Sequence, residues 1–192
     1  MQRFDYSLDF KQTDFRKHPE LYRIGRGEQG VLLVEPYKNE ILPHWRFKTP
    51  AVAEKSSAKI LRMFRAYLKA NDFVGADMAR KFLQMGWTRS MRTAKHKSGM
   101  KDVGPVPAAP KGESGAWGRK VAPYELDEEK LNAAKVFKEK FDLVRTDPDY
   151  KTPNQMRRAR DHQTSKFNKR EVANSSILRA SKIESYLRPE PK

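Results

Sequence analysis

The sequence of 192 residues contains no cysteine. Disulfides, thiol catalysis and thiolate metal sites are therefore excluded, and the composition fits a reducing compartment. Long apolar runs are also missing: the longest covers residues 31–34, whereas about 20 residues are needed to span a bilayer. The N-terminal stretch 1–12 lacks the apolar run of a signal peptide. We therefore expect a cytoplasmic protein, in the host cytoplasm if its source is viral, with no membrane partner.

Acidic residues are scarce in two parts of the chain. There are 40 Lys and Arg against 24 Asp and Glu, a net charge of +16. Residues 49–101 carry 12 basic and 3 acidic side chains and residues 151–192 carry 11 and 4, so these two segments contribute +9 and +7, while 1–48 and 102–150 contribute +2 and −2. A polyanion explains such an excess, and nucleic acid, RNA or DNA, is the expected partner. An anionic membrane is less favoured because the basic segments lack a broad aromatic or leucine face.

The pattern of the first 48 residues predicts β-structure. Apolar and polar residues alternate over 4–10, which is typical of a half-buried strand. Residues 31–34 form a short run of branched side chains, and aromatic and basic residues alternate over 45–47. We therefore predict two strands here, joined as a hairpin around residues 37–42.

The following part of the chain predicts helices. Thr49 and Pro50 are typical of a helix start, because threonine caps free amides and proline fits the first helical position. A second helix, capped by Asn71 or Asp72, is expected to end at Gly86. The predicted helices cover residues 50–70, 73–86, 88–97 and 127–145.

Two further segments complete the predicted organisation. Residues 98–123 contain five glycines and four prolines and form an irregular loop. Residues 151–192 are basic and poor in apolar side chains, so we expect an arm that is extended, or helical only on contact. The predicted fold class is α+β: one domain over residues 1–150, in which a small N-terminal β-hairpin or sheet packs with three to four helices, followed by the basic arm.

Gly25, Gly27 and Gly30 have the G-x-G-x-x-G spacing of a phosphate-binding loop. A dinucleotide-binding loop needs a strand before the glycines and a helix after them, and here the predicted order is wrong. The H-R-D and D-F-G motifs that accompany a kinase glycine loop are absent. We therefore expect no cofactor and favour a glycine-assisted turn between two strands. The other interpretation is a phosphate contact by Arg23, Arg26 and Gly27.

Catalytic and metal-binding patterns are weak. No two of the four histidines are paired at helical spacing, and we expect neither a metal nor a catalytic residue. An enzyme acting on nucleic acid stays an alternative, although the 98–123 loop offers only Asp102 and Glu113 for chemistry. The segment His44-Trp45-Arg46 predicts either a stacking platform on one strand or, more simply, a core tryptophan with exposed neighbours.

The strongest functional signal is the stretch 78–101, which has seven Lys or Arg and no acidic residue. Trp87 lies within it and could stack on a base or a sugar, whereas the simpler alternative is a solvated helical face around a core tryptophan. The C-terminal arm adds a second basic set. The predicted nucleic-acid-binding residues are Arg80, Lys81, Trp87, Arg89, Arg92, Lys95, Lys97, Lys101, Arg157, Arg158, Arg160, Lys169 and Arg170.

Three stretches resemble the amino-acid sequences of an uncharacterised protein family. They are "FDYSLDF…WRFKTP" at 4–50, "NDFVGADMARKFLQMG" at 71–86 and "GPVP…GESGAWGR" at 104–119. The family is a domain of unknown function of about 150 residues, a size typical of one domain, in bacteria, some eukaryotes and tailed phages. The resemblance covers Phe4 to about Tyr150 and implies no catalytic residue. A ribosome-associated factor, or a phage factor acting on a host protein, is the alternative to a nucleic-acid-binding protein.

Overall fold

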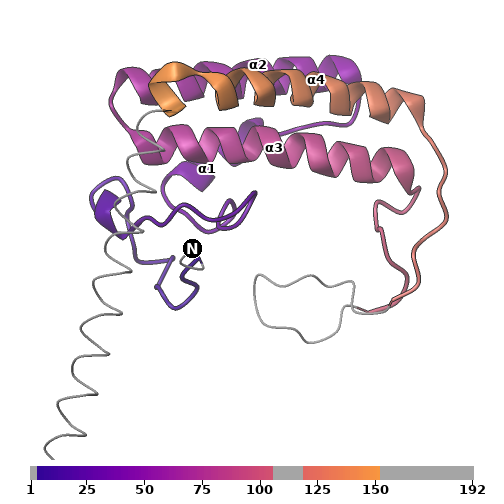
Figure 1. Ribbon diagram of the computed structural model, residues 1–192, viewed down its shortest axis with the longest axis horizontal. Helices are drawn as coiled ribbons and strands as arrows, with labels where there is room; N and C mark the ends of the chain where they lie inside the picture. The colour runs from indigo at the N-terminus through magenta and orange to yellow at the C-terminus, as the bar shows by residue number, and fades with distance from the viewer. Residues whose placement is uncertain (1–3, 106–118, 152–192) are drawn as a thin grey trace, which may run out of the picture. The chain divides into compact units, whose positions relative to one another are not determined.

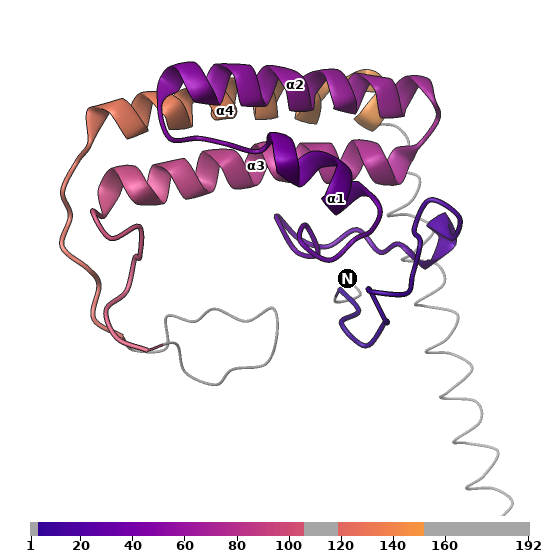
Figure 2. The same cartoon turned by 180° about the vertical axis from the view of Figure 1, so that it is seen from behind.

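Three long helices form the main layer of the computed structural model (Figure 1). They are α2 (Pro50–Lys69), α3 (Phe73–Lys95) and α4 (Glu128–Thr146). Each contacts the other two; α3 runs antiparallel to α2, and α4 returns beside both (Figure 2). The structure describes residues 4–105 and 119–151. Three short elements precede the layer: η1 (Pro19–Leu21), α1 (Tyr37–Ile41) and η2 (Leu42–His44).

The predicted helix starts near residues 50, 73 and 127 are confirmed. Thr49 accepts a hydrogen bond from the amide of Val52 and Pro50 takes the first helical position. Asp72 accepts from the amide of Gly75 at 3.0 Å, and Asp127 accepts from the amide of Lys130 at 3.0 Å. Each cap satisfies an amide that the helix itself leaves without a partner.

The prediction of an α+β fold is wrong. No strand or sheet forms within residues 4–105 and 119–151, where only two isolated bridges occur, Asp14 with Glu35 and Asp102 with Val121. The predicted strand at 31–34 is a set of turns, the predicted hairpin turn at 37–42 contains α1, and the segment 45–47 is an unpaired linker. The described residues are therefore helical and irregular.

Aspartate side chains explain why residues 4–10 and their neighbours form turns. Asp5, Asp9 and Asp14 each accept a hydrogen bond from the amide two residues further on, at 2.9, 3.0 and 2.9 Å. Such local bonds compete with pairing between strands. The alternating aromatic residues pack in a local cluster instead, in which the buried Phe4 ring lies 4.9 Å from Tyr6 and 5.6 Å from Phe10.

The branched run 31–34 is also explained by its burial pattern. Val31 and Val34 are buried while Leu32 and Leu33 are exposed, a spacing of three that fits a helical turn. The carbonyl of Gly30 accepts from the amides of both Leu33 and Val34, at 2.9 and 3.2 Å. The run is therefore a turn that leads into α1.

The predicted helix end at Gly86 is wrong, because α3 continues through it to Lys95 and includes the short helix predicted for 88–97. A Cβ atom at position 86 would lie 2.2 Å from Cδ1 of Phe137 on α4. Gly86 therefore permits the close approach of two helices rather than a change of chain direction.

Two predicted features lie largely outside the described residues. The loop 98–123 is described only at its base, and the structure of 152–192, which forms most of the predicted arm, is not described. No helix among residues 4–105 and 119–151 has the length and apolar character needed to cross a membrane.

Candidate functional site

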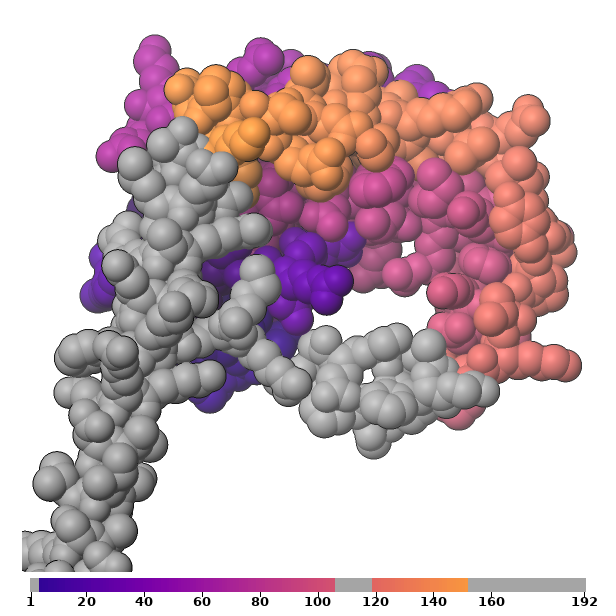
Figure 3. Space-filling model, viewed as in Figure 1, coloured from indigo at the N-terminus to yellow at the C-terminus, as the bar shows by residue number. Residues whose placement is uncertain are grey.

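The C-terminal half of α3 carries a row of exposed cations. Arg89, Arg92 and Lys95 are spaced by three residues and lie on the side of the helix away from the buried Ser90 and Ala94. No acidic side chain of the described residues forms an ion pair with any of the three. Figure 3 shows this part of α3 at the surface beneath α4. We call these three residues the α3 basic row.

The chain after α3 adds two exposed lysines, Lys97 and Lys101. His96 between α3 and Lys97 is buried, and its Nδ1–H donates to the carbonyl of Pro123 at 3.0 Å. The amide of Ala122 donates to the carbonyl of Lys101 at 2.8 Å. The two lysines therefore lie on a segment that is fixed to the returning chain.

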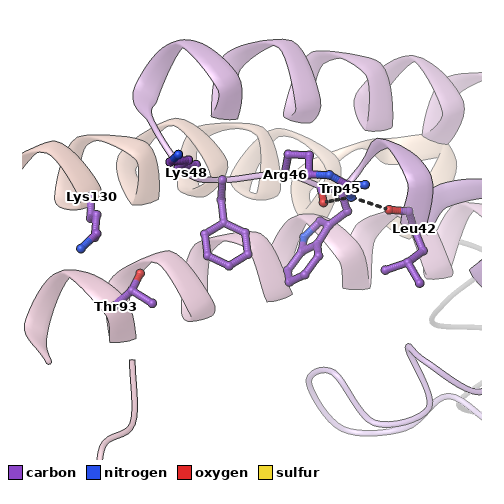
Figure 4. Close-up of a pocket in the computed structure, with 7 residues that line it drawn as sticks. Leu42, Trp45, Arg46, Lys48, Thr93 and Lys130 are labelled. Atoms are coloured by element: carbon purple, nitrogen blue, oxygen red, sulfur yellow. Dashed lines mark hydrogen bonds between the residues drawn. The ribbon is translucent and has the colours of Figure 1, made fainter. Parts of the chain in front are cut away.

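A pocket of about 560 Å³ opens between the linker that follows η2 and the C-terminal half of α3 (Figure 4). Its volume falls in the usual range for small-ligand sites, about 300–1,000 Å³. Thr93 brings α3 into its wall, one helical turn after Arg89, so both side chains lie on the same side of α3. We call it the aromatic pocket; its lining residues are Leu42, Trp45, Arg46, Phe47, Lys48, Thr93 and Lys130.

The linker between η2 and α2 fixes the aromatic side chains of this pocket. The indole N–H of Trp45 donates to the carbonyl of Phe82 at 3.1 Å, and the Trp45 ring lies 4.9 Å from that of Phe47. Ser56 Oγ accepts from the amide of Arg46 at 2.9 Å and donates to the carbonyl of His44 at 2.7 Å. The predicted stacking platform on a strand is wrong, since this linker is no strand. Trp45 is half-buried, its neighbours are exposed, and its ring still lines the pocket.

Two of the predicted phosphate contacts, Arg80 and Lys81, lie in the interior. Arg80 Nε donates to Asp77 at 2.8 Å, and Lys81 Nζ donates to the carbonyl of Gln29 at 2.7 Å. The hydroxyl of Tyr150 donates to Asp77 at 2.5 Å, and that of Tyr22 donates to the same carboxylate. Asp77 lies one position before the acid-free stretch 78–101. A charge count limited to that stretch therefore did not include the acidic partner of both cations.

Burial and charge together set the protonation of this buried cluster. Burial by itself raises the pKa of Asp77, but the charges of Arg80 and Lys81 and the two tyrosine hydroxyls outweigh it and hold the pKa well below its ordinary value. Burial, and then the charge of Asp77, raise the pKa of Tyr22 and Tyr150 above the ordinary value. The carboxylate stays ionised and the phenols stay neutral at physiological pH, which suits holding three chain segments together better than proton transfer.

Trp87 packs against α4. Its ring is stacked on Phe141 with the centroids 5.8 Å apart, and Lys138 Nζ lies 5.2 Å from the centroid of the Trp87 ring. These contacts match the alternative of a core tryptophan, and they occupy the ring that was predicted to stack on a base or a sugar.

The glycine loop, residues 25–30, forms a turn whose backbone carbonyls accept hydrogen bonds from side chains of α3. Gly27 and Gly30 have φ values of +59° and +81°, and a Cβ atom at Gly30 would lie 2.3 Å from the Phe4 ring. The carbonyls of Gly27 and Gln29 accept from Arg80 and Lys81 at 3.4 and 2.7 Å. The predicted glycine-assisted turn is confirmed, although no strands flank it. Arg23 is half-buried and Arg26 is exposed, and a phosphate contact by these residues and Gly27 stays a prediction.

A second set of cations, on the outer face of α2, was missed by the sequence reasoning. Their spacings of four, three, three and four residues are the signal that could have found them, because such spacings keep side chains on one face of a helix. No acidic side chain of the described residues pairs with them. They are Lys55, Lys59, Arg62, Arg65 and Lys69, which we call the α2 basic stripe.

No three His, Asp or Glu side chains within the described ranges are grouped in a way that could hold a metal ion. The five predicted contacts of the arm, Arg157, Arg158, Arg160, Lys169 and Arg170, lie outside the described residues.

The sequence matches one known protein family over most of its length. A family model described as "Domain of unknown function (DUF4385)" matches residues 5–165. The chain belongs to this family. The DUF4385 match continues beyond Tyr150 and includes the first part of the predicted arm with Arg157, Arg158 and Arg160. Searches of curated proteins and of solved structures gave no match. The DUF4385 assignment therefore supports the resemblance to an uncharacterised family and carries no activity.

Proposed function

We propose that this protein binds nucleic acid through phosphate contacts and does not catalyse a reaction. The observation that carries the proposal is the α3 basic row, whose three cations are exposed and lack acidic partners among the described residues. On α4, by contrast, Lys138 and Arg145 both lie near the carboxylate of Asp142. An unpaired row of like charge is unfavourable on its own and is stabilised when phosphate approaches.

The aromatic pocket supports the same function. Trp45 and Phe47 offer apolar ring surface, while Arg46, Lys48 and Lys130 bring cations to the same lining. Aromatic surface beside cations is the usual arrangement for holding an unpaired base next to its phosphates. Because the pocket adjoins the α3 basic row, one strand can contact both.

Reversing two charges of the α3 basic row tests the proposal. Arg89→Glu with Arg92→Glu is expected to weaken binding of a short labelled RNA or DNA at least tenfold, because two phosphate contacts become repulsive. The slope of log K against log salt is expected to become shallower by about 1.4–1.8, since each lost contact removes about 0.7–0.9. Fluorescence anisotropy over a salt series measures both quantities.

The matched control is Lys135→Glu with Arg145→Glu, which makes the same charge change on α4. If the α3 variant binds as tightly as this control, the contact lies elsewhere. If the unaltered protein binds neither RNA nor DNA at low salt, the proposed function is wrong. Circular dichroism of each variant verifies that the helices are retained.

A second candidate function, binding to another protein, rests on a different observation. The base of the 98–123 loop and the segment that leads from it to α4 expose large apolar side chains. Exposed apolar groups of this kind often mark interaction sites. They are Met100, Val103, Val121, Tyr124 and Leu126.

Nuclease-treated affinity capture separates the two candidates. A protein partner held by this surface is expected to stay bound after nuclease treatment and to be lost with Val121→Asp, because a buried unpaired carboxylate is unfavourable at an apolar contact. Partners that nuclease releases, or that Val121→Asp retains, would argue against a protein interface here.

A further inference from the structure

The α2 basic stripe is a continuous cationic surface. Its five residues span 14 positions of a regular helix, which corresponds to about 21 Å at 1.5 Å per residue. At 100° per residue they fall within an arc of about 120°. The buried residues Ala53, Ile60 and Phe64 occupy the opposite side of α2. The stripe therefore points directly away from the core.

The charges of this stripe are not neutralised within the described part of the chain. Glu54 is the one acidic residue of α2, and its carboxylate lies 3.4 Å from Lys140 Nζ on α4. The charges on the neighbouring helix α4 are of both signs, and some of them form local pairs, such as Lys138 with Asp142. Among residues 4–105 and 119–151 the stripe combines length, one sign of charge and the lack of an acidic partner, which is the electrostatic footprint of a polyanion contact.

The stripe and the α3 basic row lie on separate faces. Both helices contribute to one core, in which α2, α3 and α4 contact one another. In Figure 2, α2 forms the upper edge of the layer and α3 lies below it. Because each set of cations is on the side of its own helix that faces away from this core, a straight nucleic-acid segment on one set does not reach the other.

The chemistry of the stripe favours the backbone of nucleic acid over a membrane. The stripe consists of Lys and Arg alone, and its exposed apolar neighbours on α2 are small and not aromatic: Ala51, Val52 and Ala66. Helices that lie in a membrane interface bury a broad apolar face in it, and the apolar face of α2 is already in the core. The missing aromatic side chains also leave nothing to stack on unpaired bases, so a duplex, read through its phosphates, is the fitting ligand.

We propose that the α2 basic stripe is a second nucleic-acid site, specific for duplex backbone, and that the protein bridges two nucleic-acid segments. This inference rests on the proposed function, because the first segment is held by the α3 basic row. One segment lies along α3 and the other along α2, with the shared helical core between them. No chemical step is involved, and the affinity of both contacts falls with salt.

A bridging assay with the full-length protein tests the inference. A short DNA duplex is fixed to beads, the protein is added, and capture of a second, fluorescent duplex is measured. The α2 variant Arg62→Glu with Arg65→Glu is expected to bind the fixed duplex and to capture at least tenfold less of the second one. The α3 variant Arg89→Glu with Arg92→Glu is expected to lose capture similarly, and the α4 control Lys135→Glu with Arg145→Glu is expected to bridge normally.

The possible failures are distinct. If the protein binds neither single-stranded nor duplex nucleic acid at low salt, the proposed function itself fails. If it binds single strands but no duplex, the second site on α2 is wrong while the proposed function stands. If it binds one duplex without capturing a second, or if the α2 variant bridges as well as the unaltered protein, the second site on α2 is wrong. Binding to phosphatidylserine vesicles that depends on Arg62 and Arg65, with normal duplex bridging in the variant, would also overturn the inference and identify the stripe as a membrane contact.

Discussion

Replacing Asp77 by alanine is expected to lower the free energy of unfolding by about 3–5 kcal/mol, because it leaves two buried cations without their anion. Asp77 and Lys81 are fully buried and Arg80 is nearly so. The carboxylate also accepts from the hydroxyls of Tyr22 and Tyr150, which come from the N-terminal segment and from the chain after α4. Its removal therefore loosens three segments at once. Urea denaturation followed by circular dichroism measures the change.

A conservative exchange distinguishes charge from volume. Asp77→Asn keeps the shape of the side chain, yet it removes the negative charge that faces Arg80 and Lys81, so a loss of several kcal/mol is again expected. The matched exchange Glu139→Gln removes an exposed carboxylate that lies 3.1 Å from Lys140, and a change within about 0.5 kcal/mol is expected there. An Asp77→Asn protein as stable as the Glu139→Gln protein would show that the buried charges are not coupled.

The acid range gives an independent readout of the same residue. The pKa of Asp77 is held below its ordinary value of 3.8 in the folded protein. Its ionised form therefore contributes stability that is complete above 3.8 and is lost as the pH falls from there towards the folded pKa. The Asp77→Asn protein lacks this titration, so its stability is expected to fall less steeply over that range.

Helix starts were predictable because their chemistry is local. Thr49, Asp72 and Asp127 each accept a hydrogen bond from the amide three residues further along the chain, so the sequence contains both partners. The turns that replace the expected strands over residues 4–48 were not predictable from alternation alone. A period of two indicates a strand only if a second strand is present, and the Asp5, Asp9 and Asp14 turns use the backbone amides locally.

The candidate site was predicted in part for similar reasons. Arg89, Arg92 and Lys95 share a face by helical spacing alone, and the structure keeps them exposed and together. The aromatic pocket could not be derived, because it joins a linker, α3 and α4, which are far apart in the sequence. The α2 basic stripe could have been predicted, because its helical periodicity is visible in the sequence. The net charge of a segment, however, does not show which face of a helix its cations share.

Gly86 shows how one residue type can have two opposite meanings. Glycine after an apolar stripe commonly ends a helix, yet here it lies inside α3, where a Cβ atom would meet the Phe137 ring at 2.2 Å. Gly86→Val is therefore expected to lower the free energy of unfolding by about 3 kcal/mol, since overpacking outweighs the small gain in helix propensity. A variant as stable as the unaltered protein would show that the contact between α3 and α4 does not require a glycine at position 86.

A double-mutant cycle assigns that loss to the ring. Phe137→Ala alone is expected to cost about 3–5 kcal/mol, because it leaves a cavity between α3 and α4. In the double variant the valine fills part of this cavity, so the combined loss is expected to be smaller than the sum, with a coupling of about 1–3 kcal/mol. Phe64→Ala is the control: Phe64 lies beside Tyr150, which stacks on Phe73 at the opposite end of α3, so its effect should add to that of Gly86→Val. Additivity at Phe137 as well would mean that the valine is accommodated by a shift of the helices rather than by the space of the ring.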